Sequence, residues 1–332
     1  KAKDDYDQVI EEASQAGLNV IPVELPEETE GTIKLLKGNG RNMFYLGVLA
    51  QIYSVDLTTL ETTIRTTFKK LSEEKLQHNI NIFKSGVEFT KHLKIDRIEL
   101  RGVKENKEEM LLDGNTALAL GIIDAGIKFF SGYPITPASS IMHTLAKVLP
   151  HYGGILHQAE DEIAAIGAAV GSYYGGVPSI TATSGPGFSL KQEFIGFATA
   201  SEIPLILINV QRAGPSTGLP TRTEQSDLFA AAYGSHGDST KIVLSVSNVE
   251  DCFYAPHIAR YLTESLKIPV IIMSDYQMSV SYTVFDKLAV YECDQIDNVP
   301  ETVFERFGLT KPIVDIVHVK HNQSIPGEPE KM

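Results

Sequence analysis

Hydrophobic and polar positions follow different patterns in successive parts of the chain. Up to residue 93 the apolar residues recur mainly at helical spacing, whereas residues 110–280 alternate between short apolar runs and helical stretches. The periodicity is lost between these regions and again after residue 280. Because a period of two indicates strands and a period near 3.6 indicates helices, the chain is expected to hold two folded regions of different type.

The first region, residues 1–93, is mainly helical in pattern. A short apolar run at residues 20–23 predicts a strand, and Asp56 stands where it can cap the helix that follows it. The helices expected here are residues 42–53, 57–71 and 76–93. We therefore expect residues 1–93 to be the C-terminal part of an α/β domain that ends in several helices.

The segments outside the two regions have the composition of connections. Residues 94–109 are rich in charged side chains and are interpreted as a linker, with a solvated surface strand as the alternative. Residues 281–332 lose periodicity and end in Pro, Gly and charged residues, so we expect a connection toward a missing C-terminal domain. Since Lys1 is not an initiator Met, we expect the chain to be a fragment or a processed piece.

The second region, residues 110–280, repeats strand and helix. The predicted strands are residues 128–131, 154–157, 179–182, 205–210, 241–244 and 270–274. The predicted helices are residues 115–125, 138–148, 162–174, 188–200, 223–233 and 249–265. This alternation is typical of a parallel sheet with helices on both faces, and the continuous apolar run at 205–210 fits a strand covered on both sides. The predicted fold class is therefore α/β, with a doubly wound parallel sheet.

Composition excludes several classes of function. The chain has 29 basic and 42 acidic residues, a net charge of −13, which argues against nucleic acid and anionic membranes as partners. It has no apolar run of about 18 residues, and residues 1–15 lack the apolar core of a signal peptide. Its two cysteines, Cys252 and Cys293, form no CxxC, so neither a disulfide framework nor a cluster on this chain is expected. A reducing, cytoplasmic setting fits best.

Candidate chemistry gathers in four segments, each of which follows a predicted strand. They are Gly-Tyr-Pro-Ile-Thr-Pro (132–137), Glu-Asp-Glu-Ile-Ala-Ala (160–165), Thr-Ser-Gly-Pro-Gly (183–187) and Gln-Arg-Ala-Gly-Pro-Ser-Thr-Gly-Leu-Pro-Thr (211–221). In an open α/β sheet, ligands bind outside the carboxyl ends of the strands. The four segments are therefore expected to line one site.

Glu162 is the main candidate for a catalytic side chain. It opens a helix of Ala, Ile, Gly, Val, Ser and Tyr that has the composition of a helix buried almost all round. An acid at this position can be an ordinary helix-start residue, favoured by the helix dipole. It can also be a buried carboxyl that faces a ligand nitrogen. Asp161 and Glu160 are expected to be solvated, and Glu160 is the second candidate for the role. The three acids supply too few oxygens for a hard-cation site.

The other segments favour binding and positioning. Prolines stiffen the loop around Thr136, which suits a hydroxyl held in place, although a simple proline turn fits equally well. In 183–187 the glycines permit close approach to a ligand and Ser184 can cap or donate, with a plain turn as the alternative. Arg212 follows the most apolar strand, and Arg is the preferred group for holding a carboxylate; the alternative is a surface Arg.

With these motifs the chain resembles the α subunit of the 2-oxoacid:ferredoxin oxidoreductases, in the form that has a γ domain fused at its N-terminus. Over residues 110–280 the resemblance rests on GYPITPASS, HQAEDEIAAIGAAVGSYYGG, TATSGPGFSLKQE, NVQRAGPSTGLPTRTEQSDL and IPVIIMSD. Residues 1–95 resemble the C-terminal half of the γ domain, through GNGRNMFYLGVLAQIYSVD and LQHNINIFKSGVEFT. Arg212–Asp227 and GSHGD–KIVLSV are closest to members that use 2-oxoglutarate.

The resemblance implies a thiamine diphosphate enzyme whose pyrimidine-binding domain is residues 110–280. The family pattern E-x-x-A-x-x-A-x-x-G matches from Glu162 and fails from Glu160, so Glu162 is assigned as the carboxyl that bonds the pyrimidine N1′. The resemblance also implies cofactor contacts from Tyr133, Pro134, Ile135, Thr136, Ser184 and Gly185, and substrate contacts from Thr136, Arg212 and Thr221. The implied reaction is oxidative decarboxylation of a 2-oxoacid to an acyl-CoA, with reduction of ferredoxin.

Two features of the family are absent from the sequence. It has no GDG-and-Asn motif for diphosphate and Mg²⁺, and no cysteines for a [4Fe-4S] cluster. In the family both lie on the β subunit, so the resemblance implies a hetero-oligomer in which this chain is inactive alone. Another thiamine diphosphate enzyme, of decarboxylase or transketolase type, and a non-catalytic scaffold subunit of the same fold are the alternatives.

Overall fold

The computed structural model describes residues 2–18, 20–21, 23–35, 40–93, 95–100, 108–291 and 298–311. The chain divides into two compact units, Lys1–Asn106 and Lys107–Met332. Parts of the two expected connections lie outside the described residues, namely Lys94 and residues 101–107 of the first, and residues 292–297 and 312–332 of the second.

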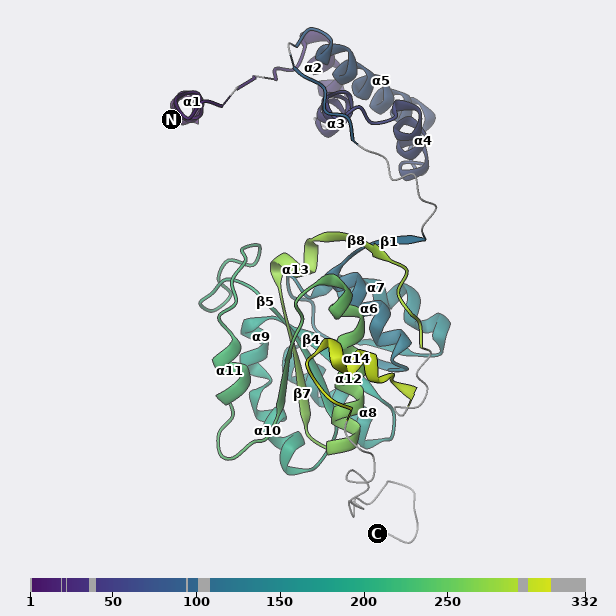
Figure 1. The fold of residues 1–332 in the computed structure, drawn as a ribbon, viewed down its shortest axis with the longest axis vertical. Helices are drawn as coiled ribbons and strands as arrows, with labels where there is room; N and C mark the ends of the chain where they lie inside the picture. Colours follow the sequence, from purple (N-terminus) through teal and green to yellow (C-terminus); the bar gives the residue numbers. More distant parts are fainter. Residues whose placement is uncertain are drawn as a thin grey trace. The chain divides into compact units, whose positions relative to one another are not determined.

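The described part of the first unit is helical (Figure 1). Its helices are α1 (Ala2–Gln15), α2 (Glu27–Leu35), α3 (Arg41–Ile52), α4 (Leu57–Thr67) and α5 (Glu73–Thr90). Asp56 caps α4 as expected, because its Oδ2 accepts a hydrogen bond from the backbone N of Thr59 at 2.8 Å. The strand predicted at residues 20–23 is wrong: residues 20, 21 and 23 are irregular, since no strand among the described residues of this unit is present to pair with them.

The core of the first unit lies between α3 and α5, where the helix backbones touch. Phe44, Ile80 and Phe83 are fully buried in this core. Gly47 of α3 lies against the carbonyl oxygen of Phe83, and Gly86 of α5 against the carbonyl oxygen of Phe44, so a Cβ at either glycine would collide with backbone. The two glycines therefore permit the close approach of the helices.

The second unit is built on a six-stranded parallel sheet in the order β3-β2-β4-β5-β7-β6. Its strands are β2 (Phe129–Gly132), β3 (Ile155–Gln158), β4 (Ser179–Thr183), β5 (Leu205–Gln211), β6 (Ile242–Ser245) and β7 (Pro269–Asp275). Strands β4, β5 and β7 are buried along their whole length, as a sheet covered on both faces requires. All six predicted strands are confirmed, with ends within one residue of those expected.

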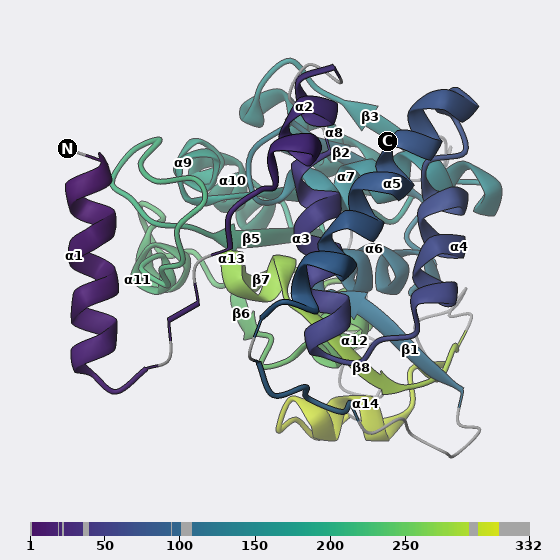
Figure 2. The same cartoon turned by 90° about the horizontal axis from the view of Figure 1, so that it is seen from above.

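Helices cover both faces of this sheet (Figures 1 and 2). One face carries α6 (Gly114–Asp124), α7 (Ser139–Val148) and α12 (Val249–Leu266). The other carries α8 (Glu162–Tyr174), α9 (Gly185–Leu190) and α10 (Gln192–Ala200). The predicted doubly wound α/β fold is therefore confirmed. Among the described residues, none of the helices has the length and apolar character needed to span a membrane.

Two of the predicted helices differ from those observed. The helix expected at 188–200 is split at Lys191, whose backbone N is shared between the carbonyls of Gly187 and Phe188 at 3.2 and 3.1 Å. The helix expected at 223–233 is reduced to α11 (Leu228–Tyr233). Residues before α11 are held in the loop instead, because Gly214 donates to Glu224 Oε2 at 3.3 Å and Gln225 donates to Asp275.

The end of the second unit contains elements that the sequence pattern did not predict. Strand β1 (Glu109–Asp113) pairs antiparallel with β8 (Tyr282–Asp286), and α13 (Tyr276–Val280) joins β7 to β8. Helix α14 (Glu301–Arg306) packs on α12, with the rings of Tyr261 and Phe304 edge to face at 4.9 Å. The described residues of the expected connection at 281–332 thus contribute to the core of this unit.

A buried contact between a histidine and a carboxylate also fastens this end of the unit. His257 Nε2 lies 2.8 Å from Asp124 Oδ2, which joins α12 to the end of α6. The backbone N of Tyr291 donates to both carboxylate oxygens of Asp124, at 3.2 and 3.0 Å. Asp124 therefore holds the chain beyond β8 onto the helices of the core.

Candidate functional site

The sheet reverses its winding between β2 and β4, and this switch point locates the candidate site. The chain leaves β2 toward α7 on one face and leaves β4 toward α9 on the other, while β3 lies outside β2. The crevice at such a point, beyond the carboxyl ends of the strands, is where doubly wound folds bind ligands. Segments 132–137 and 183–187 leave from the two strands that flank it.

Glu162 lies in the first turn of α8 with only 8% of its surface exposed. The N-cap of α8 is its neighbour Asp161, whose Oδ1 accepts from the backbone N of Ala164 at 2.8 Å. The Glu162 carboxyl is therefore not needed to cap the helix, and it has no hydrogen-bond partner within the described part of the chain. Glu160 and Asp161 are exposed.

The β4–α9 turn forms the wall beside Glu162. A Cβ placed on Gly187 would lie 2.7 Å from Glu162 Cγ and 2.8 Å from its Oε1, and would also collide with Thr183 Oγ1. Only a glycine leaves room for the Glu162 side chain in this arrangement. Ser184 is fully buried at the N-cap of α9, and its Oγ has no hydrogen-bond partner.

Arg212 joins the 132–137 loop to the loop after β5. Its guanidinium donates from Nη1 to the carbonyl of Thr136 at 2.6 Å and from Nη2 to the carbonyl of Thr217 at 2.8 Å. The Arg212 Nε is buried without a partner. Burial lowers the pKa of Arg212 from its ordinary value. A guanidinium nevertheless keeps its positive charge at neutral pH. The two carbonyls orient the group and leave donors for an anion.

Thr136 and Thr221, the two threonines expected in the substrate pocket, occupy exposed positions on these loops. The Thr136–Pro137 peptide bond is cis. The loop that contains Thr221 folds back on itself, since Ala213 donates to the carbonyl of Arg222 at 3.0 Å and bridges Leu219. Tyr133 and Pro134 are exposed and Ile135 is partly buried, beyond the carboxyl end of β2.

Four of the eight buried polar side-chain atoms that lack a partner in the described part of the chain lie along the same edge of the sheet. They are Ser184 Oγ, Asn209 Oδ1, Arg212 Nε and Ser274 Oγ. Buried polar atoms are normally paired, so a group of unpaired ones indicates that a ligand or a partner completes the site. Asn209 lies opposite Thr183 in the sheet and donates from Nδ2 to Asp227 Oδ2 at 3.0 Å. Asp227 in turn lies against Gly185.

Several residues of the site were not singled out in the sequence. Lys191, Asn209 and Asp227 belong to the site by their contacts, beside Thr183 and Gly187 of the predicted segment 183–187. Polar residues within apolar stretches were the available signal, since Asn209 interrupts the strand LILINVQ and Lys191 interrupts two apolar helical turns. The contact between Arg212 and Thr136 joins residues 76 positions apart and has no local signal.

The donor set of the site fits the pyrimidine half of a thiamine diphosphate. A buried carboxyl, unpaired polar atoms and a half-exposed aromatic ring at Tyr133 suit a flat heterocycle with ring nitrogens. Within the described ranges there is no group of three or more His, Cys, Asp or Glu side chains that could hold a metal ion.

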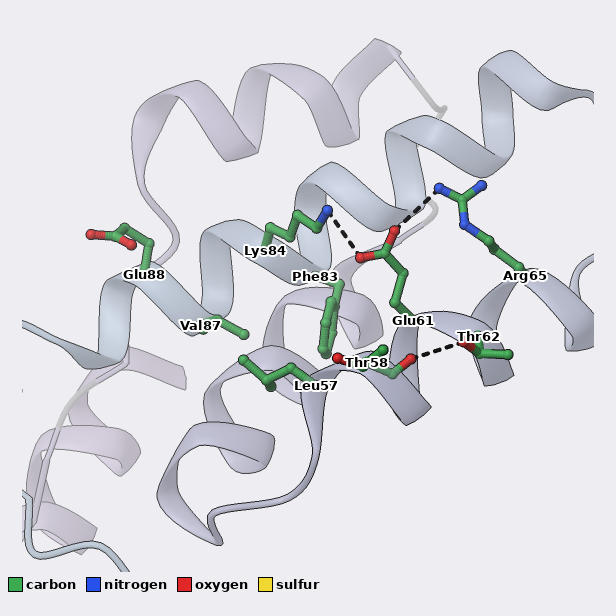
Figure 3. A pocket seen from close by; sticks show the side chains of 9 residues that line it. All are labelled: Leu57, Thr58, Glu61, Thr62, Arg65, Phe83, Lys84, Val87 and Glu88. Atoms are coloured by element: carbon green, nitrogen blue, oxygen red, sulfur yellow. Dashed lines mark hydrogen bonds and ion pairs between the residues drawn. The ribbon is translucent and has the colours of Figure 1, made fainter.

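Two cavities lie away from this edge. The one in the first unit, of about 560 Å³, lies between α4 and α5 over Leu57, Phe83 and Val87 (Figure 3). Among the residues that line it, Glu61 pairs with Lys84 at 2.9 Å and with Arg65 at 3.2 Å. A second cavity of about 470 Å³ lies at the amino ends of the strands, beside Lys128. Neither contains a residue of the Glu162 site.

The fold and the switch-point edge define a cofactor-binding α/β domain. Residues 120–307 match the family described as pyruvate flavodoxin/ferredoxin oxidoreductase, thiamine diphosphate-binding. The match covers more than half of the 332 residues, and the chain belongs to this family. The family resemblance and the thiamine diphosphate-binding fold expected from the sequence are confirmed.

Three relatives are similar to different shares of the chain. The 2-oxoglutarate synthase subunit KorA of Methanothermobacter marburgensis is 48% identical over 186 residues, which cover 55% of this chain and 50% of the relative. The 2-oxoglutarate oxidoreductase subunit KorA of Mycobacterium tuberculosis is 40% identical over 261 residues, which cover 75% of this chain and 39% of the relative. The 2-oxoacid:ferredoxin oxidoreductase 1 subunit alpha of Sulfurisphaera tokodaii is 33% identical over an alignment that covers 91% of this chain and 51% of the relative.

A solved structure is also similar. The 2-oxoglutarate:ferredoxin oxidoreductase from Magnetococcus marinus, with 2-oxoglutarate, coenzyme A and succinyl-CoA bound, has a TM-score of 0.71 and 41% identity. The similarity covers 82% of this chain and 49% of that chain. The chain thus spans about half the length, or less, of the relatives named here.

Proposed function

We propose that the second unit supplies the pyrimidine-binding half of a thiamine diphosphate site in a 2-oxoacid:ferredoxin oxidoreductase. The observation that carries the proposal is the nearly buried carboxyl of Glu162, at the switch point of the sheet. This carboxyl does not cap α8 and has no hydrogen-bond partner among the described residues. The family match over residues 120–307 supports the identity of the cofactor.

In this proposal Glu162 exchanges a proton with the pyrimidine ring. Its carboxyl is assigned to bond ring nitrogen N1′, and proton exchange there activates the aminopyrimidine as a base. When bound, thiamine diphosphate supplies the carbon nucleophile and the electron sink for decarboxylation of a 2-oxoacid. Gly187 limits where the side chain of Glu162 can lie. Tyr133, Pro134, Ile135, Thr136, Ser184 and Gly185 are assigned as contacts of the cofactor.

Arg212 is assigned to the carboxylate of the substrate. Its guanidinium is oriented by two carbonyl oxygens, and each of its two terminal nitrogens has a second N–H, so it can donate to an anion without losing its present bonds. Thr136 and Thr221, on the two loops that Arg212 connects, are assigned as further substrate contacts. Relatives named for 2-oxoglutarate support that 2-oxoacid as the substrate, with CoA as the acyl acceptor.

The rest of the active site is assigned to a partner chain. We place the diphosphate, Mg²⁺ and a [4Fe-4S] cluster on a β subunit, because this sequence contains neither a GDG-and-Asn motif nor clustered cysteines. Ferredoxin is the proposed electron acceptor. Iron–sulfur partners and a chain with only two cysteines suit the reducing cytoplasm, where we place the complex.

The test is an activity assay on the co-expressed complex. The full-length chain is purified with its partner subunit, and reduction of ferredoxin is followed with 2-oxoglutarate or pyruvate, with and without CoA. The proposal predicts CoA-dependent reduction that is faster with 2-oxoglutarate. Decarboxylation without reduction of ferredoxin would indicate a thiamine diphosphate enzyme of another type, and cofactor binding without any turnover would indicate a scaffold subunit.

A further inference from the structure

Lys191 is a fully buried lysine close to the candidate site. It lies at the break between α9 and α10, and its side chain turns inward to the sheet, where none of its surface is exposed. Removing an ammonium group from water is costly unless charged or polar partners replace the water. A lysine in this position therefore needs a physical reason.

The partners of Lys191 compensate for only part of this cost. Its Nζ donates to Thr181 Oγ1 at 2.9 Å, and among the described residues it forms no ion pair. The carboxylates that act on its charge are those of Glu162 and Asp161 at the start of α8, which raise the pKa of Lys191. Strands β4 and β5 contribute no charged side chain, and Glu193 of α10 is exposed to solvent.

The sheet and the helix place the ammonium behind the Glu162 carboxyl. Thr181 and Thr183 point to the same face of β4, about 6.7 Å apart along the strand. Gly187 and Lys191 lie one helical turn apart, joined by the hydrogen bond from Lys191 N to the Gly187 carbonyl. Gly187 lies between Thr183 and Glu162, whereas Lys191 binds Thr181, two residues before Thr183 on β4.

We propose that Lys191 is a positioning residue of the thiamine diphosphate site, whose buried positive charge acts on the pyrimidine through the Glu162 carboxyl. The inference rests on the function proposed above. A cation behind Glu162 stabilises its negatively charged form. It thereby favours the state in which the proton shared by the carboxyl and the pyrimidine lies on the ring nitrogen.

The acid–base properties of Lys191 agree with this geometry. Burial lowers the pKa of Lys191 to about 7, whereas the carboxylates of Glu162 and Asp161 act to raise it. The attraction is reciprocal, so a positive charge at Lys191 also favours the charged form of Glu162.

The test uses the complex with its partner subunit, loaded with thiamine diphosphate and Mg²⁺. Circular dichroism follows the iminopyrimidine form of the bound cofactor as the pH is raised, and calorimetry gives the cofactor Kd. We expect Lys191→Met to move the pH midpoint of the circular dichroism signal upward by about one unit or more, with a Kd within about threefold of wild type. Lys191→Arg, which keeps the charge, should stay near the wild-type midpoint.

A matched control removes a charge of the same kind elsewhere. Lys147 of α7 is exposed, and Lys147→Met should leave both the midpoint and the Kd unchanged. If Lys191→Met does not fold, Lys191→Gln replaces it, because an amide can still donate to Thr181 Oγ1 while it lacks the charge.

The outcomes separate this inference from the proposed function. An unchanged midpoint in Lys191→Met or Lys191→Gln, with a wild-type signal present, would overturn the role of Lys191 and leave the proposed function intact. Equal shifts of the midpoint in Lys191→Met and Lys191→Arg would show that the effect comes from side-chain shape and not from charge. That result would also overturn the proposed role of Lys191. A wild-type complex that binds no thiamine diphosphate would contradict the proposed function itself.

Discussion

Gly187 lies directly against Glu162, so that a Cβ on Gly187 would stand 2.8 Å from Oε1 of the carboxyl. The glycine at this turn therefore determines where the carboxyl can lie. The contact joins the β4–α9 turn to the start of α8, two of the four segments that the sequence placed at strand ends.

Substitution of Gly187 tests this contact. Gly187→Ala should displace the Glu162 side chain and lower kcat/KM for the 2-oxoacid by about tenfold or more, because misplaced catalytic groups lose rate steeply. Steady-state ferredoxin reduction by the complex measures it. Gly171→Ala in α8 is the control, since a Cβ there meets nothing within 4 Å, and we expect full activity with stability raised by about 1 kcal/mol. Equal activity of the two variants would contradict the prediction.

Arg212 should be sensitive even to a conservative change. Lys cannot span the carbonyls of Thr136 and Thr217 with a planar fork, so Arg212→Lys should raise the KM for 2-oxoglutarate about 10- to 100-fold. The exposed Arg222 in the same loop is the control, and Arg222→Lys should behave as wild type. The measurement is substrate saturation at fixed CoA. An unchanged KM in Arg212→Lys would contradict the assignment of Arg212 to the substrate carboxylate.

The Asp124–His257 pair is expected to matter for stability rather than for activity. Asp124→Ala leaves His257 buried without its partner and frees the backbone N of Tyr291, so the free energy of unfolding should fall by about 3–5 kcal/mol. Chemical denaturation of the full chain measures this loss. A change below 1 kcal/mol, within the usual range of surface substitutions, would show that the pair is dispensable.

Stability should also depend on pH through Lys191. Its pKa is about 7 in the folded chain against 10.5 for the free group, so between these values the unfolded chain binds a proton that the folded chain lacks. The contribution of Lys191 to stability therefore rises as the pH increases from about 7 to 10.5.

Lys191→Met should remove this dependence. The variant should be more stable than wild type by roughly 2–5 kcal/mol at or below pH 7, with the difference shrinking toward pH 10. Denaturation curves across this range measure both effects. A variant that is less stable than wild type at pH 6 would contradict the burial of a charged Lys191.

The architecture of the second unit was accessible from sequence because local pattern and tertiary role agree there. Strand β5 is apolar throughout and buried throughout, and α8 begins and ends at the residues expected, 162 and 174. Asp56 likewise caps α4 through a bond three residues away, which local spacing can predict.

The errors arose where distant residues decide the outcome. The run at residues 20–23 has strand-forming residues but no neighbouring strand in the described part of its unit. Strands β1 and β8 pair across about 170 residues, and a β-strand on an exposed, mixed surface carries little local signal. The split at Lys191 follows from a side-chain bond to Thr181 that helical periodicity cannot contain.

The site was predictable in part for the same reason. Glu162 could be distinguished from Glu160 by its spacing to the small residues of α8, and the structure buries the former and exposes the latter. The sequence placed segment 183–187 at the same site, and Gly187 of that segment lies against Glu162. The inward turn of Lys191 could not be predicted, because it depends on the bond to Thr181 of β4.

The most direct test is the rate of 2-oxoglutarate- and CoA-dependent ferredoxin reduction by the complex that carries Glu162→Gln, with Glu160→Gln as its control. The exchange of a proton at the pyrimidine requires the carboxyl, so Glu162→Gln should lose about 100- to 10,000-fold in rate while the cofactor remains bound. Glu160→Gln, at an exposed position, should keep the wild-type rate. A near-wild-type rate in Glu162→Gln would contradict the assignment of the catalytic carboxyl.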